Sequence, residues 1–233
     1  MNALDSAQAL QTLQWRTLQP ADLDTMFALH LRSIAGLALA TVKPETREFL
    51  HSLLEGRGQV IGAWQGRALV AYGVLQHDLL AYDDPRAVLG LPAEARVGKL
   101  AGAAVEPAWR GQGLQRVLIT QRMAAAAGAT VFATAAPGNP ASWRSLLACG
   151  LQVRAVQYLY GGHARYLLAR VPGDAWVPGA AQEVPAEELA RQETLLAQGW
   201  RIDDTSAASL ARRIENDARI YGSLITQKNI RLE

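Results

Sequence analysis

Apolar and polar residues follow two different periods along the first 170 residues, and these periods predict strands and helices in turn. Runs rich in β-branched and small apolar residues predict strands at residues 14–18, 59–64, 68–76, 96–105, 130–135, 152–160 and 163–170. Amphipathic stretches predict helices at residues 20–33, 44–54, 113–127 and 139–149, and residues 83–92 are predicted to form a loop.

Turn and capping residues support several of these boundaries. Asn139 followed by Pro140 is typical of a helix start, and Gly150 fits the left-handed position that ends the same helix. The pairs Gln65-Gly66 and Gly161-Gly162 predict hairpin turns. The inward faces of the helices at 20–33 and 113–127 are predicted to carry Leu23, Phe27, His30, Leu31, Leu114, Val117, Leu118 and Ala125.

The composition changes after Arg170, where prolines punctuate a linker. Two helix candidates follow, at residues 186–198 and 206–221, and their apolar residues would form a sizeable patch if nothing covered them. Because this segment is too short for a core of its own, we expect a main domain at residues 1–170 and a helical C-terminal appendage at 171–233. The appendage is expected to dock on the main domain, on a partner protein or on a second copy of the chain, as in a homodimer.

Composition and charge exclude several classes of protein. The chain has 233 residues, of which 50% are hydrophobic and 19% are charged, so it can form a core. A net charge of +2 without a dense basic run argues against nucleic acid as a partner. One cysteine and four scattered histidines argue against disulfides and a zinc site. Without a signal peptide or a membrane-length apolar run, the sequence predicts a soluble cytoplasmic protein.

The most informative motif is the segment 110–115 (RGQGLQ), between a predicted strand and a predicted helix. A glycine-containing turn at a helix N-terminus leaves backbone N–H groups free to bind a phosphate. The segment lacks the Gly-Lys-Ser/Thr of a P-loop, and Arg116 stands where a dinucleotide fingerprint needs its last glycine. A third pattern, Arg/Gln-x-x-Gly-x-Gly/Ala, matches at Arg110 and Gly113 but has Gln115 at its last position.

That third pattern resembles the coenzyme A loop of the GNAT superfamily, the Gcn5-related N-acetyltransferases. Residues 100–119 (LAGAAVEPAWRGQGLQRVLI) resemble the central strand, phosphate turn and helix of that family, and residues 139–151 (NPASWRSLLACGL) resemble its next helix. The resemblance covers about residues 14–170. It implies an α/β (α+β) fold with a central mixed, mostly antiparallel sheet flanked by helices, in which the strands at 96–105 and 130–135 splay apart.

The resemblance also implies that acetyl-CoA binds in the V between these strands as a cosubstrate, without a metal. The implied contacts are Ala103, Ala104, Val105, Arg110, Gly111, Gln112, Gly113, Leu114, Gln115, Arg116, Asn139 and Ser142. Small residues at 101–104 would let the pantetheine lie against the backbone; they would also allow close packing, but the phosphate-binding turn that follows favours the cofactor contact. Arg122 is a weaker candidate for the nucleotide phosphates, and Asn139 is expected to cap its helix as well.

The implied reaction is transfer of an acetyl group to a primary amine of a small molecule or protein by direct attack. Catalytic residues stay unassigned, because Leu146 stands where the family commonly has a tyrosine that protonates the leaving thiolate. Tyr158, Tyr160 or water could replace that acid, and His77, Asp78 and Glu106 are polar groups near strand ends where a base could sit. The alternatives are a non-catalytic acyl-CoA-binding or regulatory module, which Leu146 favours, and an enzyme for longer acyl chains.

Overall fold

The computed structural model describes residues 10–38, 40–174 and 180–203. The chain divides into two compact units, Met1–Arg201 and Ile202–Glu233, and the account below concerns the first. In the part of the chain that the structure describes, no helix is long and apolar enough to cross a membrane.

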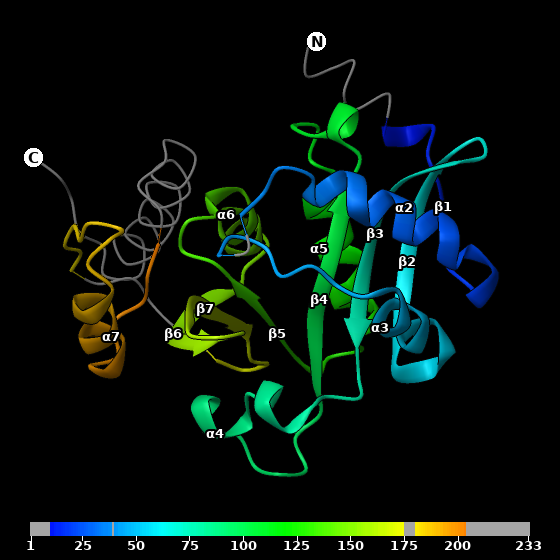
Figure 1. The fold of residues 1–233 in the computed structure, drawn as a ribbon. Helices are drawn as coiled ribbons and strands as arrows, with labels where there is room; N and C mark the ends of the chain where they lie inside the picture. The colour runs from blue at the N-terminus through cyan, green and yellow to red at the C-terminus, as the bar shows by residue number, and fades with distance from the viewer. Residues whose placement is uncertain (1–9, 39, 175–179, 204–233) are drawn as a thin grey trace, which may run out of the picture. The chain divides into compact units, whose positions relative to one another are not determined.

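A single seven-stranded sheet organises this unit, in the order β1-β2-β3-β4-β5-β7-β6 (Figure 1). Only β4 and β5 are parallel, and every other neighbouring pair is antiparallel. The sheet is therefore mixed and mostly antiparallel, which confirms the predicted class. Its strands are β1 (Gln14–Thr17), β2 (Gly58–Gln65), β3 (Ala68–Gln76), β4 (Val97–Val105), β5 (Thr130–Ala135), β6 (Gln152–Leu159) and β7 (His163–Arg170).

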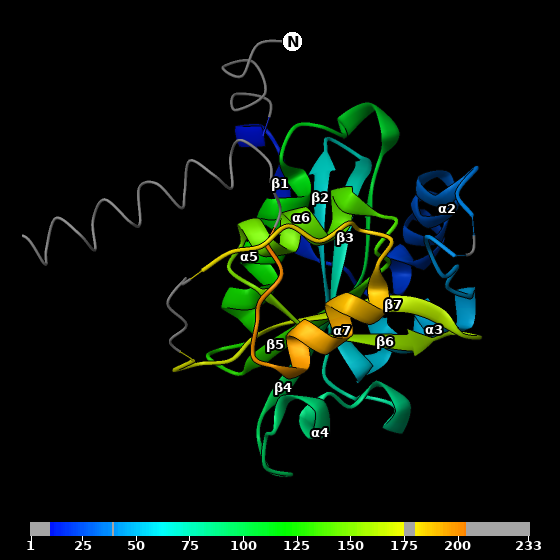
Figure 2. The ribbon, with the colours of Figure 1, turned by 90° about the vertical axis from the view of Figure 1, so that its left-hand side faces the viewer.

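Helices cover both faces of the sheet. Figure 2 shows α2 and α3 on one face and α5 and α6 on the other. The longer helices are α2 (Leu23–Ile34), α3 (Arg47–Ser52), α5 (Leu114–Ala125), α6 (Pro140–Ala148) and α7 (Leu189–Ala197). The shorter ones are η1 (Pro20–Asp22), η2 (Leu53–Arg57), η3 (Ala81–Asp83), α4 (Arg86–Leu89) and η4 (Pro107–Trp109).

The core lies on both faces of β3, which explains why its sequence is apolar throughout rather than alternating. One cluster packs α2 and α3 against the sheet, with Met26, Leu29 and Tyr72 at 0–1% exposure. A second cluster packs α5 against the opposite face through Leu114 and Leu118. Burial of these side chains fixes the position of α5, whose N-terminus borders the site described below.

Several predicted boundaries and faces were wrong. The predicted loop at 83–92 contains α4, and the helix predicted from residue 44 starts at Arg47, because Thr46 accepts a hydrogen bond from the Phe49 N–H and caps it. Leu31 is 49% exposed, and Ala125 is also exposed at the end of its helix. Met26, Leu29, Ile119 and Arg122 are buried on these two helices.

The described part of the C-terminal segment packs on the main sheet. Helix α7 contacts β6, and Leu196 is 8% exposed. The Tyr166 hydroxyl donates a hydrogen bond of 2.8 Å to Gln192 Oε1, and both residues are buried. The domain boundary at Arg170 and the homodimer stay predictions, and the predicted helix at 206–221 lies outside the described residues.

Candidate functional site

Two adjoining cavities open where β4 and β5 separate. The two strands pair only from Val97↔Thr130 to Lys99↔Phe132, and from there they diverge (Figure 1). This confirms the predicted splay. The outer groove, of about 570 Å³, is lined by the end of β4, the turn before α5 and the start of α6. The inner cavity, of about 200 Å³, adjoins it, and the lining shared by the two is Ile34, Val42, Ala103, Gln115, Asn139 and Ser142.

The turn before α5 holds two glycines in the left-handed region. The φ angle is 76° at Gly111 and 86° at Gly113, and Gly113 is the N-cap of α5. A Cβ built at either position would have no neighbour within 4 Å, so the backbone conformation rather than crowding favours glycine there. The first N–H groups of a helix have no partner inside it. The turn therefore has the geometry of an anion site.

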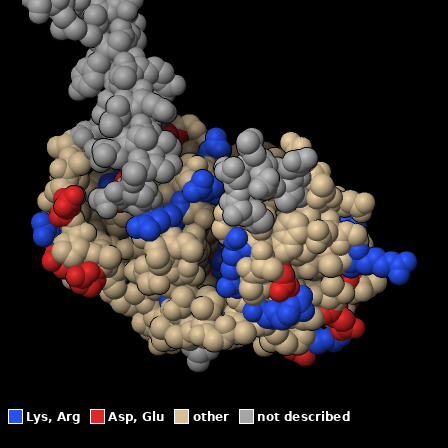
Figure 3. All heavy atoms as spheres, turned by 90° about the horizontal axis from the view of Figure 1, so that it is seen from above, with Lys and Arg blue, Asp and Glu red and all other residues tan. Residues whose placement is uncertain are grey.

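The charge of the outer groove is one-sided. Arg110, Arg116 and Arg144 line it, and no aspartate or glutamate is among the described residues of its lining. Figure 3 shows Lys and Arg side chains around the central hollow of this face, with Asp and Glu farther out. Positive potential in a groove of this kind favours an anionic ligand.

Two of the predicted phosphate contacts have other partners in this structure. The Arg110 guanidinium donates hydrogen bonds to the Ser33 carbonyl at 2.7 Å and the Val105 carbonyl at 3.4 Å, which ties the turn to the end of α2. Gln112 does not line the groove, and its side-chain amide donates to the Ala108 carbonyl. All the predicted contacts except Gln112 line the outer groove, and their role in binding stays a prediction: Ala103, Ala104, Val105, Arg110, Gly111, Gly113, Leu114, Gln115, Arg116, Asn139 and Ser142.

Arg122, the weaker candidate for the nucleotide phosphates, is instead buried in the fold. It is 1% exposed and lies against an irregularity in β4, where the register with β3 shifts. Its guanidinium donates to the carbonyls of Val74 at 3.1 Å, Ala101 at 3.3 Å and Leu118 at 3.0 Å. Burial lowers the pKa of Arg122 to about 10. Arg122 thus supports the part of β4 that borders both cavities.

The start of α6 contributes to both cavities. Asn139 Oδ1 accepts a hydrogen bond from the Ser142 N–H at 3.3 Å, which confirms the predicted cap. Leu146, one turn further on, is 4% exposed and lines the inner cavity. Of the two tyrosines considered as acids, Tyr160 lines the inner cavity, whereas Tyr158 is 57% exposed and outside it.

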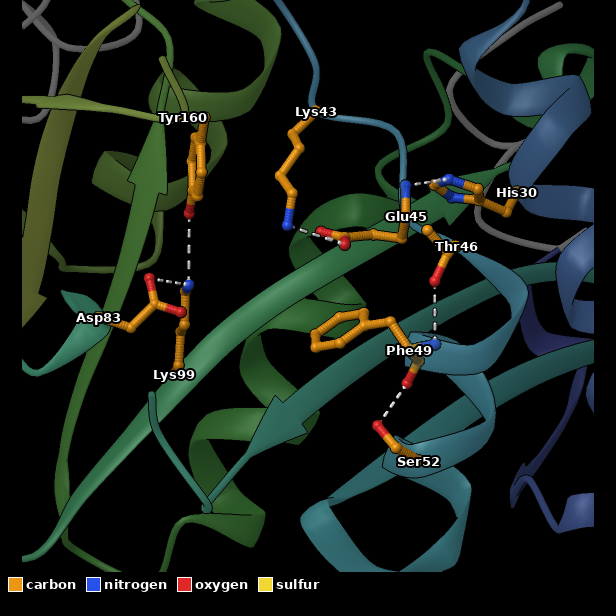
Figure 4. A network of polar contacts seen from close by, with 9 residues as sticks. All are labelled: His30, Lys43, Glu45, Thr46, Phe49, Ser52, Asp83, Lys99 and Tyr160. Atoms are coloured by element: carbon orange, nitrogen blue, oxygen red, sulfur yellow. Dashed lines mark hydrogen bonds and ion pairs between the residues drawn. The ribbon is translucent and has the colours of Figure 1, made fainter. Parts of the chain in front are cut away.

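A buried ion pair forms one wall of the inner cavity. Lys99 Nζ lies 2.6 Å from Asp83 Oδ1 and donates a hydrogen bond of 3.4 Å to the Tyr160 hydroxyl (Figure 4). The Lys99 and Asp83 side chains are only 8% and 6% exposed. Tyr160 has a φ of 54°, a region that residues with a Cβ rarely adopt. Three segments that are distant in sequence therefore meet at this wall.

The opposite wall carries Lys43 and Glu45, whose side chains are 3.2 Å apart (Figure 4). Burial raises the pKa of Glu45 above its usual range, and Lys43 opposes that shift. The Glu45 backbone N–H donates to His30 Nε2 at 3.0 Å, so the His30 Nδ1–H faces the Tyr72 hydroxyl at 3.1 Å. Burial lowers the pKa of His30, which favours this neutral form.

Arg165 completes the charged lining. It is 4% exposed, and its Nη1 donates to the carbonyls of Ala40 at 2.8 Å and Ala164 at 2.9 Å. Its guanidinium carbon lies 5.6 Å from the centre of the Tyr160 ring, whose other cationic neighbour is Lys43 Nζ at 5.2 Å. Lys43, Lys99 and Arg165 therefore surround one aromatic side chain.

None of the polar groups considered as a base lines either cavity. His77 is exposed, Asp78 pairs with Arg57 at 2.9 Å, and Glu106 pairs with Arg32 at 2.8 Å. Besides Arg122, five charged residues line the inner cavity, and none of them was predicted as a site residue: Lys43, Glu45, Asp83, Lys99 and Arg165. The only signals in the sequence were a lysine inside an apolar strand, at Lys99, and the acidic pair at Asp83-Asp84.

Comparisons with known proteins agree on the fold. No protein-family model and no curated protein matches the sequence. Solved structures do match, among them a GNAT-family acetyltransferase from Streptococcus pneumoniae, with a TM-score of 0.52 and 15% identity over 68% of this chain and 98% of that one. The yncA protein from Salmonella typhimurium, solved with its cofactor acetyl-CoA, has a TM-score of 0.53 and 17% identity over 72% and 99% of the two chains.

A third match is the ribosomal-protein-S18-alanine N-acetyltransferase from Escherichia coli, with a TM-score of 0.52 and 16% identity over 73% of this chain and 99% of that one. At these identities the likeness shows the fold, which is the GNAT acetyltransferase fold. In the part of the chain that the structure describes, no group of His, Cys, Asp and Glu is arranged to hold a metal ion.

Proposed function

We propose that the protein transfers an acetyl group from acetyl-CoA to a primary amine by direct attack in a ternary complex. One observation carries the proposal: a cationic groove at a helix N-terminus opens into a smaller, polar cavity at the point where β4 and β5 part. The two compartments match two substrates, a long anionic one and a small polar one. The GNAT fold and the acetyl-CoA in one of the similar structures support the assignment.

The outer groove suits coenzyme A. Its pyrophosphate would bind the N–H groups of the turn containing Gly111 and Gly113, with Arg116 nearby. Its pantetheine would lie along Ala103 and Val105, at the edge of β4 that faces β5 and has no strand partner there, while the other edge pairs with β3. Bound acetyl-CoA would supply an activated thioester carbonyl, and a backbone N–H near Val105 would polarise it.

The amine would enter the inner cavity and must lose a proton before or during attack, because amines are mostly protonated at neutral pH. We assign the proton acceptor to Glu45. Its carboxylate lines this cavity, and its raised pKa makes it a better base than an exposed glutamate. Attack forms the new C–N bond, the C–S bond breaks, and coenzyme A leaves as a thiolate.

Leu146 cannot protonate that thiolate. Of the two tyrosines considered as acids, Tyr160 lines the inner cavity, and its hydroxyl already contacts the Lys99 ammonium. A thiol with a pKa of ~8.5 is also a tolerable leaving group without an acid. The rival function, a non-catalytic acyl-CoA-binding module, is favoured by Leu146 but leaves the charged inner cavity without a purpose.

Two glycines at the ends of α5 allow a matched test. Gly113→Glu would place a carboxylate in the proposed phosphate site, whereas Gly128→Glu would introduce the same strain near the other end of the helix, since φ is 86° and 77° at the two positions. Calorimetry should show that Gly113→Glu abolishes acetyl-CoA binding and that Gly128→Glu preserves it. Equal affinity of both folded variants would refute the site.

Activity separates the two candidate functions. The wild-type protein should release coenzyme A from acetyl-CoA in the presence of at least one member of a broad amine panel. Tight binding of acetyl-CoA without any release would favour the binding module. Tighter binding of NAD or ATP than of coenzyme A would refute both.

A further inference from the structure

The guanidinium of Arg165 is buried without a negative partner. Arg165 is 4% exposed on β7, and among the described residues no aspartate or glutamate forms an ion pair with it. Its Nη1 is occupied by two backbone carbonyls, but its Nη2 is buried and has no hydrogen-bond partner. A buried cation in this state is costly, and native proteins rarely keep one without a purpose.

The charges of the inner cavity do not balance without a ligand. Lys43 is paired with Glu45 at 3.2 Å, and Lys99 is paired with Asp83 at 2.6 Å. Arg122 and Arg165 line the same cavity, and neither forms an ion pair among the described residues. Three backbone carbonyls hold the Arg122 guanidinium, whereas Arg165 has a buried Nη2 without a hydrogen-bond partner. The Tyr160 ring beside it offers a weak cation–π contact but no acceptor in the plane of the guanidinium.

We propose that the acceptor carries a carboxylate and that Arg165 binds it through Nη2. The inference rests on the proposed function and names the substrate class of the same site. A carboxylate provides one negative charge for Arg165, the cation of this cavity whose buried Nη2 has no hydrogen-bond partner, whereas a phosphate dianion would bring two. Charge-assisted hydrogen bonds from Arg to carboxylates are among the strongest available in proteins.

The size of the inner cavity limits the rest of the acceptor. At about 200 Å³ it is smaller than the ~300–1,000 Å³ typical of sites for drug-sized ligands. The carboxylate and the amine must both fit between Arg165 and the junction with the outer groove at Ala103 and Asn139. A free amino acid or a similarly small amino carboxylate meets these conditions. The N-terminal residue of a protein does not, because its carboxyl group is part of a peptide bond and has no negative charge.

Paired substrates test the proposal on the wild-type protein. Coenzyme A release is measured with a panel of amino acids and with the corresponding carboxamides, which keep the amine and lose the negative charge. Loss of a charged hydrogen bond predicts that kcat/KM falls roughly ten- to hundredfold for the carboxamide, mainly through KM. Equal kcat/KM for acid and amide would overturn the proposal and leave the proposed transferase intact.

A matched pair of variants tests the residue. Arg165→Met should abolish the preference for the acid over the amide, whereas Arg170→Met, at the exposed end of the same strand, should keep it. Both variants should bind acetyl-CoA like the wild type in calorimetry. An unchanged preference in Arg165→Met would assign the carboxylate to another group and overturn the proposal. If Arg165→Met does not fold, the paired substrates decide alone.

A binding measurement covers the case in which no amine is acetylated. Amino acids at millimolar concentration should then raise the Tm of the wild-type protein more than their carboxamides do. A difference between the two would support the carboxylate site even though the transferase assignment failed. No difference would overturn the site as well.

Discussion

The contact between Gly73 and Arg122 gives a sharp test of how the site is supported. Gly73 lies on β3 and pairs with Ala103 of β4, which lines both cavities. A Cβ added at Gly73 would lie 2.8 Å from Nε and 3.0 Å from Cζ of Arg122. Because three backbone carbonyls hold that guanidinium, it cannot swing aside as an exposed side chain would.

Gly73→Ala should therefore destabilise the fold. Ordinary contacts begin near 3.4 Å, so Arg122 must move by several tenths of an ångström and weaken hydrogen bonds of 3.0–3.3 Å. Overpacking of this kind costs about 1–3 kcal/mol. For a chain of this size, that corresponds to a fall in Tm of roughly 2–12 °C. Thermal and urea unfolding followed by circular dichroism would measure it.

Two controls isolate the contact. Gly102→Ala, on β4, adds the same methyl group where nothing lies within 4 Å, so it should be neutral or slightly stabilising. Gly73→Ala should also cost less in an Arg122→Met background, because the flexible thioether can yield. If Gly73→Ala has wild-type stability, or costs the same in both backgrounds, the steric argument is wrong.

Two further predictions concern the chemistry. Burial holds the pKa of Glu45 above its usual value, so its proton-accepting form is lost at a higher pH than for an exposed glutamate. The value of kcat/KM should therefore fall as the pH decreases through that raised pKa. Glu45→Gln should remove this fall at acidic pH together with most of the activity. If Glu45→Gln shows the same fall of kcat/KM at acidic pH, another residue is the base. Leu146→Tyr adds a phenol to the inner cavity, so it should raise or maintain turnover. Its acetyl-CoA affinity should stay nearly unchanged in calorimetry. Reduced turnover in a folded variant would contradict this prediction.

Local patterns predicted most of the individual helices, strands and turns, whereas the resemblance to the GNAT superfamily predicted the arrangement of the sheet. Residues 130–135 form a strand with the predicted bounds, and Asn139 caps α6 as predicted. The turn at Gly111 and Gly113 has the positive φ angles that a phosphate-binding turn needs. These signals lie within one element or one turn, so their physical causes are local: side-chain periodicity, a cap hydrogen bond and the missing Cβ of glycine.

The charged lining of the inner cavity could not be predicted in the same way. Glu45 lies on the loop before α3, Lys99 on β4 and Arg165 on β7, and each would be read as a solvated residue in its own segment. Only the sheet topology brings them together. Arg122 shows the same difficulty, because the helical pattern does not reveal that its guanidinium crosses the core to reach β3 and β4.

The two cavities differ in electrostatics in a way that sorts the proposed substrates. The outer groove is lined by Arg110, Arg116 and Arg144 and has no aspartate or glutamate among its described lining residues, a composition that suits a ligand with several phosphates. The inner cavity pairs two lysines with two carboxylates and adds Arg122, which three backbone carbonyls hold, and Arg165, whose Nη2 has no hydrogen-bond partner. A polyphosphate gains little there, whereas a small molecule with one amine and one carboxylate finds both a proton acceptor and a cation. The order of charges along the joined cavities therefore favours one orientation of the ternary complex, with the thioester at the junction formed by Ala103 and Asn139.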